Sequence, residues 1–271
     1  IVISIPSAYA VQALRELDRN IFAGKKIISA IKGVLPDSNL LLNEYLKKEF
    51  NLELKDYFAV LGPCHAEEVA AEKLSYLTFT GIDEATTHAI ASCFKTPYLN
   101  TVENNDIFGV QFAAVLKNIY AVGSGIAHGL DYGDNFLSVF IANCADEMAG
   151  FLKKAGIKNI EVGHTDIRQP SEEHRPHNYA ASVYLGDLLV TCYSLHSRNR
   201  AFGNMIGKGY SVKAAQLEMS MVAEGYYAGK CMHVINQKIM ADMPIADTIY
   251  RILWENLPAA EGFNRIELTL V

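Results

Sequence analysis

The chain has 271 residues, half of them apolar, and a formal net charge of −6 at pH 7. This length and composition suffice for one large or two ordinary globular domains with packed cores. The acidic balance, without a basic stripe interleaved with aromatic residues, argues against a nucleic-acid partner. No signal-peptide pattern opens the chain, and no apolar stretch approaches the roughly 20 uncharged residues that cross a bilayer, so we expect no membrane span.

Cysteine usage indicates the redox compartment. The five cysteines are spread singly along the chain without CxxC spacing, and their odd number leaves at least one unpaired. Unpaired cysteines of this kind fit a reducing cytoplasm better than an oxidising compartment. We therefore expect a cytoplasmic location.

The first hundred residues alternate β-rich and helical runs, beginning at once with a strand-like run over residues 1–5. Because natural chains seldom begin inside a sheet, we expect that sequence upstream of residue 1 is missing. Runs such as residues 58–61 are continuously apolar, which is typical of parallel strands covered by helices on both faces. We expect strands over residues 1–5, 26–31, 57–61, 75–80 and 97–102, separated by helices over residues 7–19, 39–49, 64–73 and 83–94.

After about residue 109 the strand signal largely disappears. Val115, Ile119, Val122 and Ile126 repeat at helical spacing, and similar runs follow. The pattern predicts an α/β domain with a parallel sheet over residues 1–108 and an all-α domain over residues 109–271. We expect the later helices near residues 135–154, 180–193, 212–239 and 246–255.

Two glycine patterns resemble nucleotide-binding loops but stand in the wrong context. Residues 123–129 spell GxGxxxG inside the helical periodicity, not between a strand and a helix, which favours close helix packing. Residues 203–209 resemble a Walker loop, yet they have three intervening residues in place of four and no Ser or Thr after the lysine. We interpret this second pattern as the end of a helix.

A polar, proline-broken segment over residues 164–178 contains three of the eight histidines: His164, His174 and His177. These histidines lack the HExxH or short paired spacing that preassembles a metal site on a helix. We therefore expect a solvated loop and no metal.

Polar and charged side chains gather over residues 185–200, where Asp187, Thr191, Ser197, Arg198 and Asn199 follow one another closely. A guanidinium offers a planar fork of donors that matches a phosphate or carboxylate, and serine and asparagine can satisfy the remaining oxygens. A basic run at a helix start is more often a solvated face. With suitable partners, however, this cluster predicts an anionic substrate.

Two lysines in apolar runs, Lys117 and Lys32, are candidate partners. A buried ammonium costs free energy unless something compensates it, which favours a chemical role. The alternative, a stem packed on the core with its head in water, stays open for each. Residues 62–68 follow a strand and open a helix, so their backbone amides could also face an anion.

Six short motifs carry a resemblance that none of them carries alone. They are IKGVLP (residues 31–36), GPCHA (62–66), LKN (116–118), GDLLVT (186–191), SRNRAFG (197–203) and MVAEG (221–225). In this order they resemble the bacterial NAD(P)-dependent glycerol-3-phosphate dehydrogenases nearly end to end. The resemblance implies an N-terminally incomplete Rossmann domain, a helical domain for substrate binding and dimerisation, and a homodimeric oxidoreductase that interconverts dihydroxyacetone phosphate and sn-glycerol 3-phosphate for phospholipid synthesis.

The resemblance also implies roles for single residues. Lys117 becomes the catalytic proton donor and acceptor. The residues implied around the substrate are Lys32, Gly62, Cys64, Lys117, Asn118, Asp187, Thr191, Ser197, Arg198 and Asn199. Those implied to contact the cofactor, NAD(H) or NADP(H), are Pro6, Lys32, Ala66, Arg198, Val222 and Glu224. Cys64 stands where the family usually has Ser or Thr, so we expect a weaker substrate hydrogen bond there, or one from the backbone.

The chemistry of the implied reaction suits an ammonium group. When hydride reaches a carbonyl, charge grows on its oxygen, which an ammonium can stabilise and protonate. Exclusion of water and a second lysine would lower the pKa of Lys117, whereas Asp187 would raise it, and the sequence leaves open which effect dominates. Two other functions also stay open: a related hydroxyacid dehydrogenase, and a non-catalytic sugar-phosphate-binding module.

Overall fold

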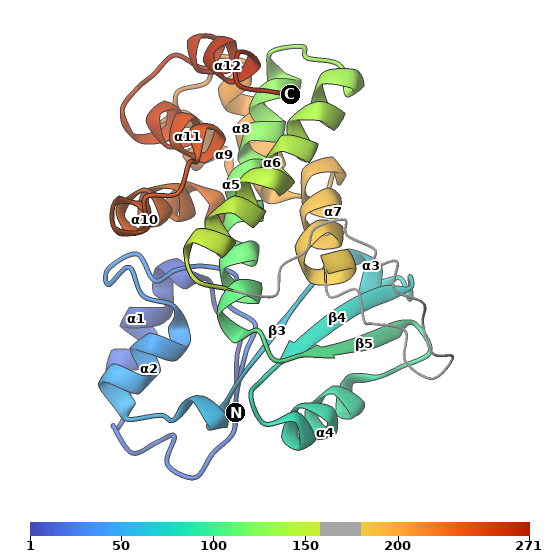
Figure 1. Ribbon diagram of the computed structural model, residues 1–271, viewed down its shortest axis with the longest axis vertical. Helices are drawn as coiled ribbons and strands as arrows, with labels where there is room; N and C mark the ends of the chain where they lie inside the picture. Colours follow the sequence, from blue (N-terminus) through green and yellow to red (C-terminus); the bar gives the residue numbers. More distant parts are fainter. Residues whose placement is uncertain (158–179) are drawn as a thin grey trace.

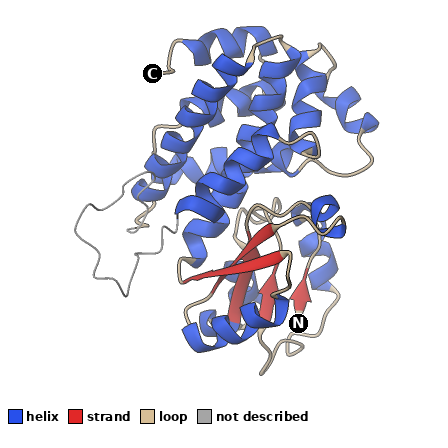
Figure 2. Cartoon of the chain, turned by 90° about the vertical axis from the view of Figure 1, so that its right-hand side faces the viewer, coloured by secondary structure: helices blue, strands red, loops and turns tan. Residues whose placement is uncertain are grey.

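The computed structural model describes residues 1–157 and 180–271. A five-stranded sheet with its helices forms the N-terminal part of the chain, and a group of helices forms the rest (Figure 1 and Figure 2). The predicted order, an α/β domain followed by a helical domain, is confirmed. The exact division between residues 108 and 109 stays a prediction; it falls in the first turn of α5 (Ile107–Gly129).

The strands lie in the sheet in the order of the sequence. β3 and β4 occupy the predicted positions; β3 is buried throughout, and β4 is buried except at Tyr76 and Leu77. The strands are β1 (Val2–Ile3), β2 (Ile27–Ser29), β3 (Tyr57–Leu61), β4 (Ser75–Thr80) and β5 (Leu99–Asn104).

One strand pairing differs from the expected parallel arrangement. β3 and β4 run antiparallel, with Ala59 opposite Thr80, whereas the other three pairings are parallel. The connection between them contains only α3 (Ala66–Ala70), five residues long. A helix of that length spans about 7.5 Å, and β3 spans about 16 Å. Because a parallel partner needs a crossover that returns along the whole strand, the chain enters β4 in the opposite direction.

Alternating residues of the strands face two different helix layers. Val60 and Phe79 pack on α4 (Glu84–Phe94). Ala59 and Leu61 belong to the main core, to which α1 (Ser7–Arg15), α2 (Leu42–Phe50) and α5 contribute. The sheet therefore has helices on both faces, as its apolar strands predict.

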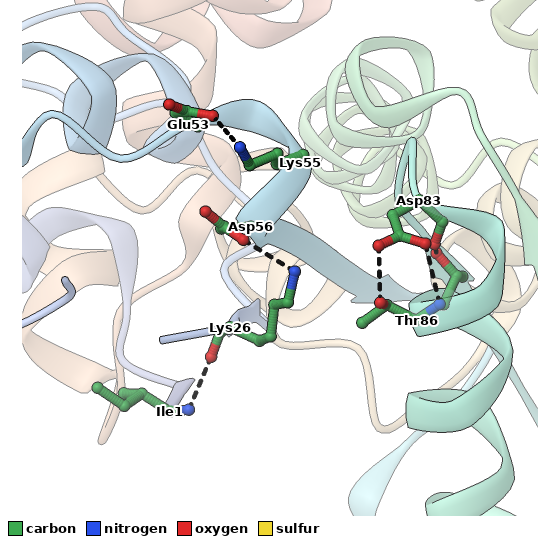
Figure 3. Close-up of polar contacts among 8 residues, drawn as sticks. Ile1, Lys26, Glu53, Lys55, Asp56, Asp83 and Thr86 are labelled. Carbon is green, nitrogen blue, oxygen red and sulfur yellow. Dashed lines mark hydrogen bonds and ion pairs between the residues drawn. The ribbon is translucent and has the colours of Figure 1, made fainter. Parts of the chain in front are cut away.

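Side-chain hydrogen bonds fix the ends of several elements in this domain (Figure 3). Asp83 caps α4, accepting from the Thr86 N–H at 3.1 Å and from the Thr86 hydroxyl at 2.8 Å. Lys26, just before β2, pairs at 2.8 Å with Asp56, just before β3. Caps and pairs of this kind set where helices begin and how neighbouring strands align.

The helical part of the chain is built around α5. The predicted run over residues 212–239 divides into two helices, and the last helix was not predicted. The elements after α5 are α6 (Asp134–Lys154), the π-helical segment η2 (Ala180–Gly186), α7 (Asp187–Tyr193), α8 (Arg198–Gly207), α9 (Val212–Glu218), α10 (Glu224–Ile239), α11 (Pro244–Trp254) and α12 (Ala259–Glu267).

The expectation that no stretch of this chain is long and apolar enough to cross a bilayer is wrong for α5. By length and composition α5 could do so, but 89% of its most apolar window is buried inside the protein. Other helices pack around it, which explains why it is apolar on all sides. α5 is the core helix of this domain.

Glycines hold α5 against α8, as the first glycine pattern predicts. A Cβ on Gly125 would overlap the Arg200 carbonyl oxygen, and one on Gly203 would overlap the Val122 carbonyl oxygen. Gly129 and Gly207 approach each other in the same way one turn further on. α8 then ends at Gly207, which confirms that the second pattern is the end of a helix. This close packing fixes the side chains that α5 and α8 present to each other.

Candidate active site

An ion pair lies in the interior of the helical domain, between α5 and the first turn of α7. The Lys117 Nζ contacts Asp187 Oδ2, and the two side chains are only 4% and 2% exposed. Burial lowers the pKa of Lys117 to about 8, Asp187 opposes this change, and the charge of Lys32 adds to it. Of the competing effects that the sequence left open, desolvation dominates.

α7 shapes the carboxylate side of this pair. Thr191 donates its hydroxyl proton to the Asp187 carbonyl oxygen at 2.5 Å and lies 3.5 Å from Asp187 Oδ1. The Thr191 hydroxyl is therefore already a donor within its own helix. Its oxygen can still accept a hydrogen bond.

The turn after β3 brings two further titratable side chains beside the pair. Gly62 has φ +127°, and a Cβ there would lie 3.0 Å from the Tyr76 carbonyl oxygen, so the turn needs glycine. Cys64 and His65 are half-buried. Burial raises the pKa of the Cys64 thiol, and the charge of Lys32 opposes this. Near neutral pH Cys64 is therefore a weak S–H donor and not a thiolate.

His65 was not among the sequence predictions. Burial lowers the pKa of this imidazole, and the charges of Lys117 and Lys32 lower it further. The side chain is therefore neutral near pH 7. His65 belongs to the GPCHA motif, so its position in that motif could have identified it as a site residue. Ala66, the next residue, is exposed at the start of α3.

Two asparagines connect four segments of the chain. The Gly225 N–H donates to Asn199 Oδ1 at 2.9 Å, Asn199 Nδ2 donates to Asn118 Oδ1 at 2.9 Å, and Asn118 Nδ2 donates to the Lys32 carbonyl oxygen at 3.1 Å. Both asparagines are buried. Each amide nitrogen has a second N–H that these bonds do not use. α10, α8, α5 and the loop after β2 are thus joined in one row.

Ser197 and Arg198 lie at the start of α8. The buried Ser197 hydroxyl caps the helix, accepting from the Arg200 N–H at 3.3 Å. Arg198 is exposed, and its Nη1 lies 3.1 Å from Met221 Sδ. Within residues 1–157 and 180–271, no carboxylate forms an ion pair with this guanidinium. Toward the described part of the chain, its donors are available to an anion.

Two of the residues implied for the cofactor line one pocket of about 470 Å³. It lies between the start of α1 and the segment joining α9 to α10, next to Arg198 through Met221. Its lining combines the apolar and aromatic side chains of Pro6, Tyr9, Met221, Val222, Tyr226 and Tyr227 with the polar Gln216 and Ser220.

The structure therefore groups the implied residues in two places. Lys32, Cys64 and Asp187 lie within electrostatic reach of Lys117, and Asn118 and Asn199 bond next to it. Pro6 and Val222 share the pocket. Glu224 does not face that pocket; both its carboxylate oxygens bind Ser7. His164, His174 and His177 lie outside the described residues.

Comparison with known proteins places the chain in a family. The model of the NAD-dependent glycerol-3-phosphate dehydrogenase N-terminus matches residues 1–87, and that of the C-terminus matches residues 106–264. The glycerol-3-phosphate dehydrogenase [NAD(P)+] of Halalkalibacterium halodurans is 33% identical over 256 residues, covering 94% of this chain and 69% of that protein. The corresponding protein of Listeria monocytogenes is 32% identical over 265 residues, covering 97% and 73%.

A solved structure of the same family has the same fold as this chain. The crystal structure of glycerol-3-phosphate dehydrogenase from Coxiella burnetii has a TM-score of 0.85 to this chain at 26% identity, covering 99% of this chain and 76% of that one. The agreement spans both the sheet and the helical part. The chain belongs to the family of NAD(P)-dependent glycerol-3-phosphate dehydrogenases.

Proposed function

We propose that this chain interconverts dihydroxyacetone phosphate and sn-glycerol 3-phosphate with NAD(H) or NADP(H), and so supplies glycerol 3-phosphate for phospholipid synthesis. The observation that carries the proposal is the buried ion pair of Lys117 and Asp187, which a hydrogen bond between the neighbouring residues Asn118 and Asn199 connects to Arg198. Among the described residues, no carboxylate pairs with the Arg198 guanidinium. Family membership supports the same reaction. From the family resemblance we further propose that the protein acts in the cytoplasm as a homodimer.

The pocket next to Arg198 fits the nicotinamide end of the cofactor. Its aromatic and apolar walls suit a planar ring, and a guanidinium lies at its edge through the contact with Met221. Pro6, Val222 and Arg198 would hold this ring, with Lys32 and Ala66 on the sheet side. When bound, the nicotinamide supplies hydride to the substrate carbonyl carbon or takes it back.

Lys117 provides the proton that the reaction needs. As the carbonyl carbon gains hydride, its oxygen becomes negative, and the Lys117 ammonium stabilises this charge and donates a proton to it. The lysine is left as a neutral amine and regains a proton from solvent. In the reverse direction the neutral amine accepts the hydroxyl proton. A pKa of about 8 keeps both forms accessible near neutral pH.

Asp187 keeps the ammonium oriented and opposes its loss of charge. Because the pair is excluded from water, this interaction is stronger than it would be at the surface. Arg198 would hold the substrate phosphate, and the remaining N–H groups of Asn118 and Asn199 would bind substrate oxygens. Holding both ends of a three-carbon substrate fixes its carbonyl for reaction.

A direct assay tests the proposal. The purified protein is mixed with NADH or NADPH, and the nicotinamide absorbance is followed with and without dihydroxyacetone phosphate. We expect a loss that depends on this substrate. Its absence in a protein whose circular dichroism shows a folded chain would reject the proposed reaction.

A substrate panel separates the alternatives. Dihydroxyacetone phosphate, unphosphorylated dihydroxyacetone and a 2-oxoacid are compared under the same conditions. Preference for the 2-oxoacid would indicate a hydroxyacid dehydrogenase. Calorimetric binding of glycerol 3-phosphate without turnover would indicate a binding module.

A further inference from the structure

Glu224 and Ser7 join the two parts of the molecule. Glu224 is the first residue of α10, and Ser7, 217 positions away, is the first residue of α1. The Ser7 N–H donates to Glu224 Oε1 at 2.9 Å, and the Ser7 hydroxyl donates to Glu224 Oε2. Ser7 is only 2% exposed. Both carboxylate oxygens are thus engaged by one residue of the sheet domain.

A third segment meets this pair. A Cβ on Gly33 would lie 2.5 Å from Ser7 Oγ and 3.0 Å from Glu224 Oε2, so only glycine leaves room for the contact. Gly33 follows Lys32, whose carbonyl oxygen accepts from Asn118. On the other side, Gly225 follows Glu224, and its N–H donates to Asn199.

These contacts close a ring. It runs from Lys32 through Asn118 and Asn199 to Gly225, passes to Glu224 and Ser7, and returns through Gly33. The asparagines belong to the implied substrate site, and Pro6, beside Ser7, lines the pocket. The ring therefore connects the substrate side of the site with the cofactor side.

We propose that Ser7 and Glu224 are positioning residues that hold the sheet domain closed on the helical domain. In this role the Glu224 carboxylate accepts hydrogen bonds from Ser7 and acts through the two segments that it joins. It fixes Pro6 and the Lys32 backbone at the distance from Arg198 and Lys117 that binding requires. The inference rests on the proposed function, because it concerns the same site.

The role predicts opposite results for two substitutions of one residue. In Glu224→Gln, the amide oxygen can accept from the Ser7 N–H while the amide nitrogen donates to the Ser7 hydroxyl oxygen, so both bonds survive without charge. In Glu224→Ala both are lost. Ser7→Ala keeps one of the two bonds. Gly33→Ala separates the segments by steric overlap.

Steady-state kinetics are measured for all four variants. If opening leaves a tenth of the molecules closed, KM for NAD(P)H and for dihydroxyacetone phosphate rises about tenfold, with a smaller change in kcat. We expect this rise in KM for Glu224→Ala and Gly33→Ala, and a smaller rise for Ser7→Ala. In Glu224→Gln we expect KM to return most of the way from the Glu224→Ala value toward that of the wild type. Glu44→Ala is the matched control, because Glu44 accepts from the Leu41 N–H within the sheet domain alone; a change confined to stability is expected there.

Hydrogen exchange without substrate gives a readout that needs no turnover. In Glu224→Ala we expect faster exchange in peptides covering residues 6–10 and 31–36, with the β3 and β4 peptides unchanged. The inference is overturned if Glu224→Ala leaves KM and this exchange as in the wild type, or if Glu224→Gln behaves like Glu224→Ala. A wild-type protein without turnover would reject the proposed function, and the exchange experiment would then still decide the contact.

Discussion

Lys117 and Asp187 form a buried ion pair in which each side chain is the counter-charge of the other. Their exposure is 4% and 2%, so water does not replace a missing partner. Removing one charge of such a pair leaves the other uncompensated, which costs much more than removing both. This asymmetry separates the effect of a substitution on catalysis from its effect on folding.

Lys117→Met is expected to lower turnover at least about 100-fold, because no other group replaces the proton donor. It should also lower the free energy of unfolding by about 3–5 kcal/mol, because Asp187 stays buried without a partner. Adding Asp187→Leu should restore most of the stability and none of the activity. Assays and denaturant titrations measure the two effects. Near-normal turnover of Lys117→Met would show that another residue transfers the proton.

The pH dependence of the two directions should be opposite. Reduction of dihydroxyacetone phosphate requires the Lys117 ammonium, so its rate should fall as pH rises through about 8. Oxidation of glycerol 3-phosphate requires the neutral amine and should rise through the same range. Profiles of kcat/KM report groups of the free enzyme and are the measurement of choice. Two profiles that are flat between pH 7 and pH 9 would contradict this assignment.

The charges around Lys117 should move this midpoint in opposite directions. Asp187 raises the pKa of Lys117, so Asp187→Asn should move the midpoint lower. Lys32 lowers that pKa, so Lys32→Gln should move it higher. Lys26→Gln is the control, because Lys26 pairs with Asp56 at the surface. Equal midpoints in all three variants would place the titrating group elsewhere.

Among substrates, Arg198→Ala should weaken binding of the phosphorylated ones most. A charge-assisted hydrogen bond contributes about 1.5–3 kcal/mol, which corresponds to a rise of roughly 10- to 100-fold in KM for dihydroxyacetone phosphate. At saturating NAD(P)H, which offsets the loss of the Arg198 contact with the cofactor, turnover of unphosphorylated dihydroxyacetone should change much less. Arg251→Ala, which removes an exposed arginine paired with Glu255, is the control. An equal loss on both substrates would argue against phosphate binding by Arg198.

Gly203→Ala should destabilise the protein by about 1–3 kcal/mol, because its Cβ would overlap the Val122 carbonyl oxygen and push α5 and α8 apart. It should also weaken activity by separating Asn118 from Asn199. Gly150→Ala in α6 is the matched control, because nothing lies within 4 Å of its Cβ. There we expect up to about 1 kcal/mol of added stability from higher helix propensity. Thermal unfolding distinguishes the two, and an equally stable Gly203→Ala would contradict the packing argument.

Local pattern predicted most of the secondary structure and less of its arrangement. A continuous apolar run placed β3 correctly, a β-rich run placed β4, and helical spacing placed α5 and α6. The antiparallel entry of β4 depends on the short connection through α3, which apolar periodicity does not report. The break between α9 and α10 contains neither glycine nor proline, so the sequence gives no local sign of it.

In the candidate site, too, the sequence identified single residues but not how they are arranged. Sequence motifs single out Lys117, Asp187 and Arg198, but whether Lys117 has a lowered pKa depends on burial, which only the packed structure determines. The contact of Ser7 with Glu224 joins residues 217 positions apart that share no motif. Such contacts follow from the tertiary arrangement and are invisible to a reading of neighbouring residues.

The continuity of α5 determines which part of the molecule stays fixed. α5 carries Lys117 and Asn118 and is held on α8 by glycine contacts, so both residues keep their places relative to Asp187 and Asn199. A rocking motion of the sheet would move Pro6 and Lys32 and leave the acid–base pair assembled. Opening and closing of the sheet domain would then control entry and release of ligands, while the ion pair of Lys117 and Asp187 stays intact.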